Sequence, residues 1–283
     1  VQHTIIPNDT WRIVWGGSIR QDQLYSPGLI TSNDTENVNL YRAFANIEWK
    51  YTKKTSINAG AMWEKNDLTG KSLSPRLALL FFADKQNTLR AVASKATRTP
   101  TLIEYDGEII YHFTGSLLPA PVDYPLLKGT SNTTHETITS HELGLNSRFA
   151  DIGLITDIKL FRDSIKDIIH FDSTSGTAVP QNSEDVTLSG VEVQADLKTF
   201  TGGRIFFGYS FTKINSNDIF EDYSETAPTR NMSLLASQRF KNNIVGSLTL
   251  YKVSESDGLE SGSAIPAHER ADVRILTPHK ETY

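Results

Sequence analysis

The sequence predicts an all-β protein: an antiparallel, up-and-down transmembrane β-barrel that is incomplete, with about twelve strands of a larger barrel. Three observations predict this class. Apolar and polar residues alternate over many long segments, and short turns alternate with longer loops between these segments. The longest apolar run, residues 77–83, is far shorter than the ~20 residues that a helical membrane span needs.

The alternation is clearest in residues 74–82 and 87–98, which a tight turn at residues 83–86 joins. In the second segment apolar and polar side chains point to opposite faces: Leu89, Ala91 and Ala93 against Arg90, Ser94 and Arg98. One face of this hairpin is therefore apolar and the other is charged. Pro100 lacks a backbone donor, so we expect a long irregular segment to begin there.

The same period gives strands along the rest of the chain. They are expected at residues 10–22, 41–51, 56–64, around 143–146, at 154–160, 190–197 and 204–211, on both sides of 241–243, and at 269–276. Short turns are expected near Lys53, Asp84, Ala150, Gly202 and Asn242, and longer loops near Asn33, Thr69, Tyr111, Thr177, Asp222 and Gly258. Outer-membrane barrels have this asymmetry, with short periplasmic turns at one end and long extracellular loops at the other.

Composition excludes several function classes. A net charge of -5 argues against a nucleic-acid binder, and the absence of cysteine excludes a disulfide scaffold and a thiolate metal site. No nucleophile elbow, zinc-protease motif or phosphate-binding loop is present, so the sequence predicts no enzyme and no cofactor. His112, His135 and His141 could suggest a metal site, but nothing in the sequence fixes the distances between them. Val1 is not an initiator methionine, and we expect the chain to begin further upstream.

The loop from Thr99 to Thr134 spans roughly 35 residues, and loops of that length are usually functional. It carries aromatic and polar groups of the kind that hold a bulky ligand. The candidate ligand-binding residues are Arg98, Tyr105, Tyr111, His112, Phe113 and Tyr124. The alternative is that the aromatic residues pack on one another and that Arg98 pairs with a neighbouring carboxylate.

Several segments resemble one known family, in the family's order. They are Ser74-Pro75-Arg76-Leu77-Ala78-Leu79, Ser94-Lys95-Ala96-Thr97-Arg98-Thr99-Pro100-Thr101-Leu102-Ile103-Glu104, His141-Glu142-Leu143-Gly144-Leu145 and Ser189-Gly190-Val191-Glu192. This set is similar to the barrel of TonB-dependent outer-membrane receptors. The chain departs from the family pattern where the long loop closes. Thr130, Thr133 and His135 stand where the family usually has Asn, Leu and Pro.

The resemblance implies that residues 1–283 form part of the barrel of a receptor in a Gram-negative outer membrane, without its plug domain. Such receptors take up a scarce ligand, typically a ferric siderophore, another iron complex or cobalamin, and the TonB energy-coupling protein acts through the plug. Outer-membrane lipid would surround the barrel. The alternatives are a passive pore or adhesin barrel, and a soluble β-rich binding protein. In the soluble alternative Ile47, Leu89, Val193 and Phe207 would meet in a dry interior under a second layer.

Overall fold

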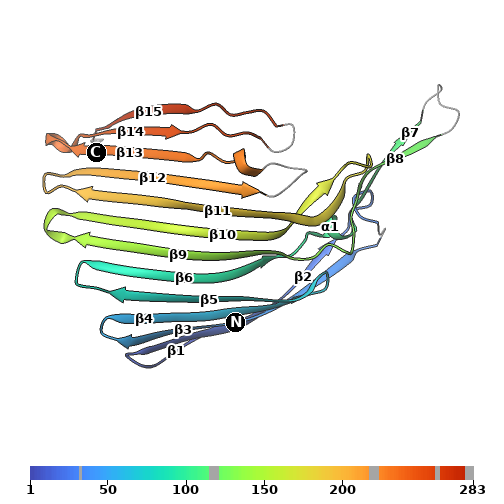
Figure 1. Cartoon of the computed structure of the whole chain (residues 1–283), viewed down its shortest axis with the longest axis horizontal. Helices are drawn as coiled ribbons and strands as arrows, with labels where there is room; N and C mark the ends of the chain where they lie inside the picture. Colours follow the sequence, from blue (N-terminus) through green and yellow to red (C-terminus); the bar gives the residue numbers. More distant parts are fainter. Residues whose placement is uncertain (32–33, 115–120, 217–222, 259–261, 278–283) are drawn as a thin grey trace, which may run out of the picture.

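The computed structural model describes residues 1–31, 34–114, 121–216, 223–258 and 262–277. The described chain forms one antiparallel sheet of 13 strands, in which neighbours follow the order of the sequence (Figure 1). The one skip in this order is that β6 pairs with β9, because β7 and β8 form a separate two-stranded sheet. The expected class, an up-and-down antiparallel sheet that does not close, is therefore confirmed.

The strands of the large sheet are β1 (Gln2–Asn8), β2 (Trp11–Leu24), β3 (Glu36–Thr52), β4 (Thr55–Asn66), β5 (Gly70–Phe82), β6 (Asn87–Arg98), β9 (Glu136–Phe149), β10 (Leu154–Asp172), β11 (Val179–Lys198), β12 (Gly203–Ser216), β13 (Arg230–Arg239), β14 (Val245–Val253) and β15 (His268–Leu276). The sequence pattern did not reveal the extent of β1, because Ile5, Ile6 and Pro7 break the alternation. Its pairing with β2 makes it the first strand of the sheet.

One face of the sheet is apolar and exposed. The register places Leu77 opposite Ala93, Ala91 opposite Leu143, and Leu143 opposite Leu160. Leu77, Leu143 and Leu160 are 54%, 60% and 53% exposed. The described residues include only four buried hydrophobic ones: Ile30, Ala78, Ile169 and Val186. The apolar side chains of the strands are thus not used to build an interior.

The positions of four residues, Ile47, Leu89, Val193 and Phe207, distinguish a membrane barrel from a soluble β-sandwich. Ile47 and Leu89 are 37% and 46% exposed, and Val193 and Phe207 lie in the same sheet, on β11 and β12. Within the described residues no second layer covers this sheet. A dry interior between two layers, which the soluble alternative requires, is not what the fold provides.

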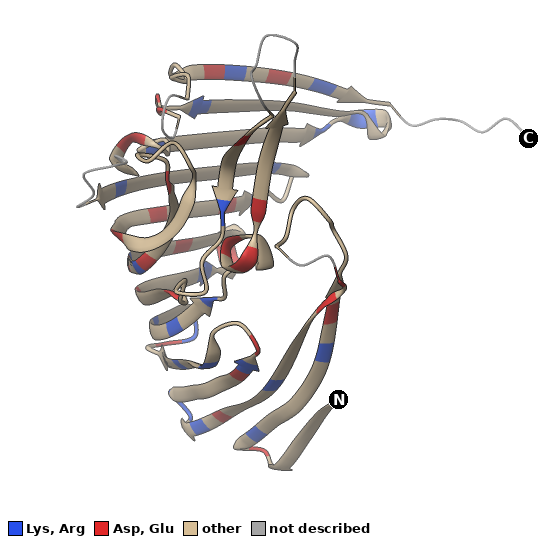
Figure 2. Cartoon of the chain, turned by 90° about the vertical axis from the view of Figure 1, so that its right-hand side faces the viewer, with Lys and Arg blue, Asp and Glu red and all other residues tan. Residues whose placement is uncertain are grey.

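The opposite face carries ion pairs between neighbouring strands. Arg90 of β6 donates from Nε to Glu142 of β9 at 2.5 Å and from Nη1 to Asp157 of β10 at 2.7 Å. Further pairs on this face are Arg42 with Glu64, Lys159 with Glu192, and Arg204 with Asp196. Viewed from the end with the long loops, the sheet curves into an open trough, and α1 (Leu102–Asp106) lies on its concave side (Figure 2).

The turns mostly confirm the expected alternation of short and long connections. At the short-turn end, the helical turns η1 (Ala150–Ile152) and η3 (Lys241–Asn243) join β9 to β10 and β13 to β14, and Gly202 adopts φ +82° before β12. The connection near Thr69 was expected to be longer but has only three residues. The Asn66 side chain accepts hydrogen bonds from the amides of Leu68 and Thr69, and Gly70 (φ +80°) completes the tight turn.

A further short helical turn, η2 (Tyr223–Glu225), lies in the β12–β13 connection. No helix in the described ranges is both long and apolar enough to cross a membrane.

Candidate functional site

The connection between β6 and β9 is structured, whereas the sequence predicted an irregular segment. It contains the helix α1 and the strands β7 (Glu108–Phe113) and β8 (Val122–Lys128), which pair into a hairpin that projects from the long-loop end of the sheet (Figure 1). We call this hairpin the arm. Pro125 does not prevent the pairing, because it lies beside the register shift between Ile109 and Ile110.

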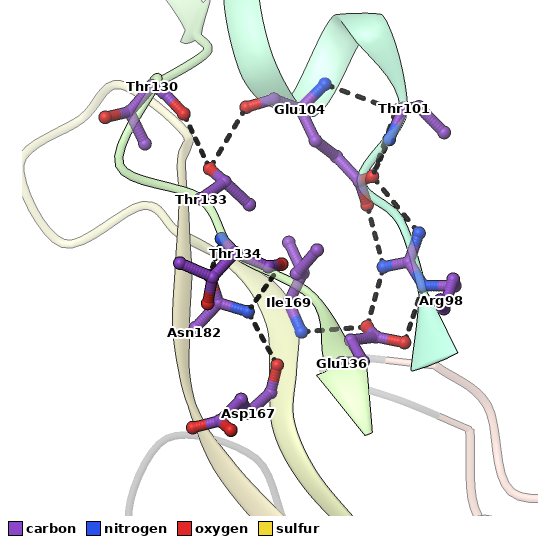
Figure 3. A network of polar contacts seen from close by, with 10 residues as sticks. All are labelled: Arg98, Thr101, Glu104, Thr130, Thr133, Thr134, Glu136, Asp167, Ile169 and Asn182. Atoms are coloured by element: carbon purple, nitrogen blue, oxygen red, sulfur yellow. Dashed lines mark hydrogen bonds and ion pairs between the residues drawn. The ribbon is translucent and has the colours of Figure 1, made fainter. Parts of the chain in front are cut away.

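Arg98, the last residue of β6, is held by two carboxylates at the foot of this connection. It donates to Glu136 from Nε at 2.5 Å and from Nη2 at 2.6 Å. It also donates to Glu104 from Nη1 and Nη2, both at 3.1 Å. Glu136 is the cross-strand partner of Arg98 on β9, and Glu104 lies on α1 (Figure 3). Of the two readings of Arg98, pairing with neighbouring carboxylates is the one that the structure shows.

Glu104 also closes a capping box at the start of α1. The Thr101 hydroxyl accepts a hydrogen bond from the Glu104 amide, and the Glu104 carboxylate accepts from the Thr101 amide at 2.6 Å. A helix of five residues is far too short to be stable alone, so these contacts, together with Arg98, decide whether it forms. We call Arg98, Thr101, Glu104 and Glu136 the loop base.

The hydrogen bonds of the loop base stabilise the charged form of Glu104. Burial alone would raise the pKa of Glu104, which is 8% exposed. The hydrogen bonds from Arg98 and Thr101 outweigh burial and lower the pKa of Glu104 below its ordinary value. Glu136 has a second task, because its Oε1 accepts a hydrogen bond from the amide of Ile169 on β10 at 2.9 Å. The loop base thus joins β6, α1, β9 and β10.

Two neighbouring connections hold the arm where it leaves the sheet. On the β2–β3 side, the amide of Thr31 donates to Asp106 at 3.2 Å and the amide of Glu108 donates to Leu29 at 3.0 Å. On the β10–β11 side, the amide of Ala178 donates to Leu126 at 2.8 Å, and the amide of Lys128 donates back to Ala178 at 2.9 Å. Backbone contacts on both flanks therefore fix the direction of the arm.

The return from β8 to β9 is also tied down, although its residues depart from the family pattern. The Thr130 amide donates to the Glu104 carbonyl at 3.1 Å, and the Thr133 hydroxyl donates to the Thr130 carbonyl at 2.7 Å. The Thr134 amide donates to Asn182 of β11 at 2.7 Å (Figure 3). Gly129 lies so close to Gly107 that a β-carbon at position 129 would lie 2.4 Å from the Gly107 nitrogen. Only glycine fits there.

The outer half of the arm presents an aromatic surface. Tyr111 lies opposite Tyr124 and Phe113 opposite Val122 in the hairpin register, so these four side chains share one face. Tyr111, Phe113 and Tyr124 are 55%, 51% and 45% exposed. The rings of Tyr111 and Phe113 lie 6.2 Å apart and tilted. On the other face, His112 Nδ1 lies 2.6 Å from an Asp123 carboxylate oxygen.

A cleft of about 550 Å³ opens on the concave face beside the loop base. Arg98, Thr101 and the ion pair of Arg42 with Glu64 contribute to its wall. Glu64 also accepts a hydrogen bond from the hydroxyl of Thr99 at 3.3 Å. Arg20 with Asp22 and Arg42 with Glu64 are ion-paired in this wall, and apolar side chains such as Leu40 and Met62 complete it.

His135, at the end of the β8–β9 return, lies against the tight turn between β4 and β5. Its Nε2 is 2.8 Å from the Thr69 hydroxyl. Burial lowers the pKa of His135, and the nearby Glu64 carboxylate only partly offsets this effect. Within the described ranges, no three His, Asp or Glu side chains are close enough together to hold a metal ion.

The six predicted site residues fall into two groups. Tyr111, His112, Phe113 and Tyr124 are together on the arm. Arg98 and Tyr105 lie below it, at the end of β6 and on α1. Sequence reasoning missed Glu104 and Glu136, which fix Arg98. The Thr-x-x-Glu spacing of Thr101 and Glu104 is a capping-box signal and could have revealed the first of them.

The fold and this loop define a class: a barrel wall of up-and-down strands whose longest connection carries a projecting hairpin with exposed aromatic side chains. The family described as "TonB dependent receptor-like, beta-barrel" matches residues 3–267. The chain therefore belongs to this family of receptor barrels. No curated protein sequence matches the chain significantly.

Solved structures agree with this assignment at the level of the fold. The siderophore receptor PirA of Acinetobacter baumannii superimposes with a TM-score of 0.78 at 13% identity, over 99% of this chain and 48% of PirA. A variant of the ferric enterobactin receptor PfeA of Pseudomonas aeruginosa gives 0.75 at 15% identity, over 96% and 44%. The FrpB iron transporter of Neisseria meningitidis gives 0.71 at 13%, over 96% and 46%. The chain thus spans about half the length of these structures.

Proposed function

We propose that this chain is part of the barrel of a receptor in the outer membrane of a Gram-negative bacterium, and that the receptor takes up a ferric siderophore. Uptake would be energised by the TonB protein, acting through a plug domain elsewhere in the full-length receptor. The edge strands β1 and β15 each have one neighbour in the sheet. Further strands of the receptor would pair with these edges and close the barrel.

The continuous exposed apolar face supports the membrane location. In water, an unbroken apolar surface across most strands of a 13-stranded sheet would be a strong aggregation hazard. In a bilayer it is the expected lipid-facing surface, with the ion-paired face turned to the lumen. Most strands exceed the ~9–11 residues that a tilted strand needs to cross the bilayer.

The observation that carries the ligand proposal is the aromatic face of the arm, held in place by the loop base. Large ferric chelates have flat, polarisable surfaces that suit contact with tyrosine and phenylalanine rings. We propose that Tyr111, His112, Phe113 and Tyr124 contact the ligand, with Tyr105 and Arg98 supporting the arm from below. The names of the similar structures, siderophore receptors and an iron transporter, support an iron complex over cobalamin.

Two measurements test this proposal: the growth of a deletion strain on single iron sources, and the binding of a siderophore by variants of the receptor. A strain lacking the gene is grown with single iron sources, namely a catecholate siderophore, a hydroxamate siderophore or haem, and with cobalamin as the only vitamin source. We expect loss of growth on one siderophore. Fluorescence quenching should then show that replacing Tyr111 and Tyr124 by alanine weakens binding of that siderophore by roughly tenfold or more.

The matched control is Phe200→Ala, which removes an aromatic side chain that is 87% exposed in the β11–β12 turn, at the other end of the sheet. It should leave affinity unchanged. Growth loss only on cobalamin would refute the iron ligand. Uptake that persists without TonB would favour a passive pore, and a receptor recovered from the soluble fraction would favour the soluble alternative.

A further inference from the structure

The arginines that line the cleft beside the loop base are engaged by carboxylates of the protein itself. Among the described residues there are three of them, and the nitrogen–oxygen distances of their ion pairs lie between 2.5 and 3.1 Å. The pairs are Arg20 with Asp22, Arg42 with Glu64, and Arg98 with Glu104 and Glu136. An anionic group in the cleft could bind one of these arginines only by displacing a carboxylate that is already in place.

Carboxylates without a cation surround the same place. Glu36 lines the cleft, Asp106 ends α1, and Glu108 begins β7 at the foot of the arm. None of the three forms an ion pair with a residue that the structure describes. Lys128 lies opposite Glu108 in the arm and offsets only one of these charges. Around the loop base, acidic residues therefore outnumber basic ones, as the red segments of α1 and of the arm show (Figure 2).

Basic residues at the ends of the neighbouring strands point away from this mouth. The strand period places Lys95 of β6 on the same face as Ala93, and Arg162 of β10 on the same face as Leu160. Both therefore lie on the apolar face of the sheet. The next position on β10 belongs to the concave face, and it is occupied by Asp163. The outward cations thus cannot neutralise a ligand on the concave side.

The groups that remain available to a ligand at this end are mostly uncharged. The arm presents the exposed rings of Tyr111 and Phe113, and Leu40 and Met62 line the cleft. Such surfaces hold a ligand through contact area, whatever its charge. The unneutralised carboxylates, in contrast, oppose the approach of an anion and leave a neutral ligand unaffected. Contact area and charge together therefore discriminate ligands by their net charge.

We propose that the mouth of this receptor selects a ferric chelate without net negative charge, of the tris-hydroxamate class, and disfavours chelates of the tris-catecholate class. Three hydroxamate groups, each with a single negative charge, neutralise Fe³⁺. Three catecholate groups, each with a double negative charge, leave the complex with a triple negative charge. The inference rests on the ferric ligand proposed above and narrows it to one class of chelate.

Binding of two iron chelates to the full-length receptor in detergent tests the inference. The probes share one tripodal scaffold, carry either three hydroxamate or three catecholate arms, and are loaded with Fe³⁺. We expect the neutral probe to bind about tenfold more tightly, or better, at ~0.01 M salt. Raising the salt to ~0.15 M shortens the Debye length from about 30 Å to about 8 Å. Binding of the anionic probe should then strengthen, and binding of the neutral probe should hardly change.

The double variant Glu36→Gln, Glu108→Gln tests the carboxylates directly, because it leaves the ion pairs of the loop base in place. A single charge about 10 Å from a triple charge in water changes binding by roughly fivefold at ~0.01 M salt and by about twofold at ~0.15 M. The variant should therefore tighten binding of the anionic probe by roughly 20-fold at the lower salt and leave the neutral probe unaffected. The matched control, Asp9→Asn with Asp151→Asn, removes two exposed carboxylates at the short-turn end and should alter neither probe.

Equal or tighter binding of the catecholate probe, weakened by salt, would overturn the inference and leave uptake of a ferric chelate standing. A double variant that changes the two probes equally, or changes neither, would also overturn it. Binding of neither iron chelate by a receptor that still binds cobalamin would refute the proposed function and the inference with it.

Discussion

Replacing Arg98 by glutamine should release the arm without unfolding the sheet. The change removes four charge-assisted hydrogen bonds and leaves Glu104 and Glu136 facing each other without a cation. The side chains of these two carboxylates are only 11% and 15% exposed, whereas that of Arg98 is 43% exposed. Removing one partner of a fully buried pair costs ~3–5 kcal/mol, and an exposed pair contributes ~0–1 kcal/mol.

Because Arg98 is partly exposed, we expect its replacement to cost about 2 kcal/mol, between the values for a fully buried and an exposed ion pair. This corresponds to roughly a 30-fold change in the equilibrium for opening the arm. The cost should fall on the local opening of α1 and the arm, because the ladders on either side of β6 do not depend on the Arg98 side chain. Hydrogen exchange of the amides of Tyr105 and Gly107, which bond within and just after α1, measures this opening directly.

The control is Arg204→Gln, which removes a bidentate partner of Asp196 on the exposed part of the β11–β12 pair. It should leave exchange in α1 unchanged. If Arg98→Gln also leaves these amides as protected as in the unmodified protein, the loop base does not hold the arm, and the reasoning from burial and hydrogen bonds is refuted.

Two further predictions follow from the same geometry. Because the pKa of Glu104 in the folded loop lies below its unfolded value of 4.5, the stability it contributes is complete above about pH 4.5 and is lost as the pH falls toward the folded pKa; exchange in α1 should rise in that window, and Glu104→Gln should abolish the rise. Ile158→Arg, on the apolar face, should cost roughly 2–4 kcal/mol in bilayer insertion assays, whereas Gln194→Arg, on the concave face, should cost much less. Equal costs would show that the two faces have been assigned the wrong way round.

The strands of the wall, apart from β1, were predictable because each one shows its own alternation of apolar and polar residues. Leu89, Ala91 and Ala93 reveal the period of β6 without knowledge of any neighbour, and pairing in chain order then fixes the sheet. The large sheet has 13 strands among the described residues, against about twelve expected. The exception near Thr69 arose because a three-residue turn held by the Asn66 side chain has the same polar composition as a longer loop.

The arm and its base could not be derived in the same way. The segment Glu108–Phe113 does not alternate, and its hairpin is held by loops that precede it by about 80 residues or follow it by about 50, as the bonds of Leu29 and Ala178 show. Single-sequence patterns carry no information on such distant contacts. The partnership of Arg98 with Glu136 likewise depends on β6 and β9 pairing across the intervening connection.

The distribution of charge suggests different roles for the concave face of the sheet and for the arm. On the concave face several cations are held in ion pairs, such as Arg90 with Asp157, and these pairs lower the net charge that a ligand in the lumen would meet. A transporter needs a wall that holds its ligand weakly, because binding that is too tight in the channel would prevent release. Selectivity would then rest on the arm, whose exposed rings can hold a ligand through contact area instead of charge. In the loop base the Arg98 guanidinium donates hydrogen bonds to Glu136 and to Glu104. It therefore cannot also bind an anionic chelate while the arm is held in place. An anionic ligand that displaced Glu136 from Arg98 would therefore loosen the arm as it bound.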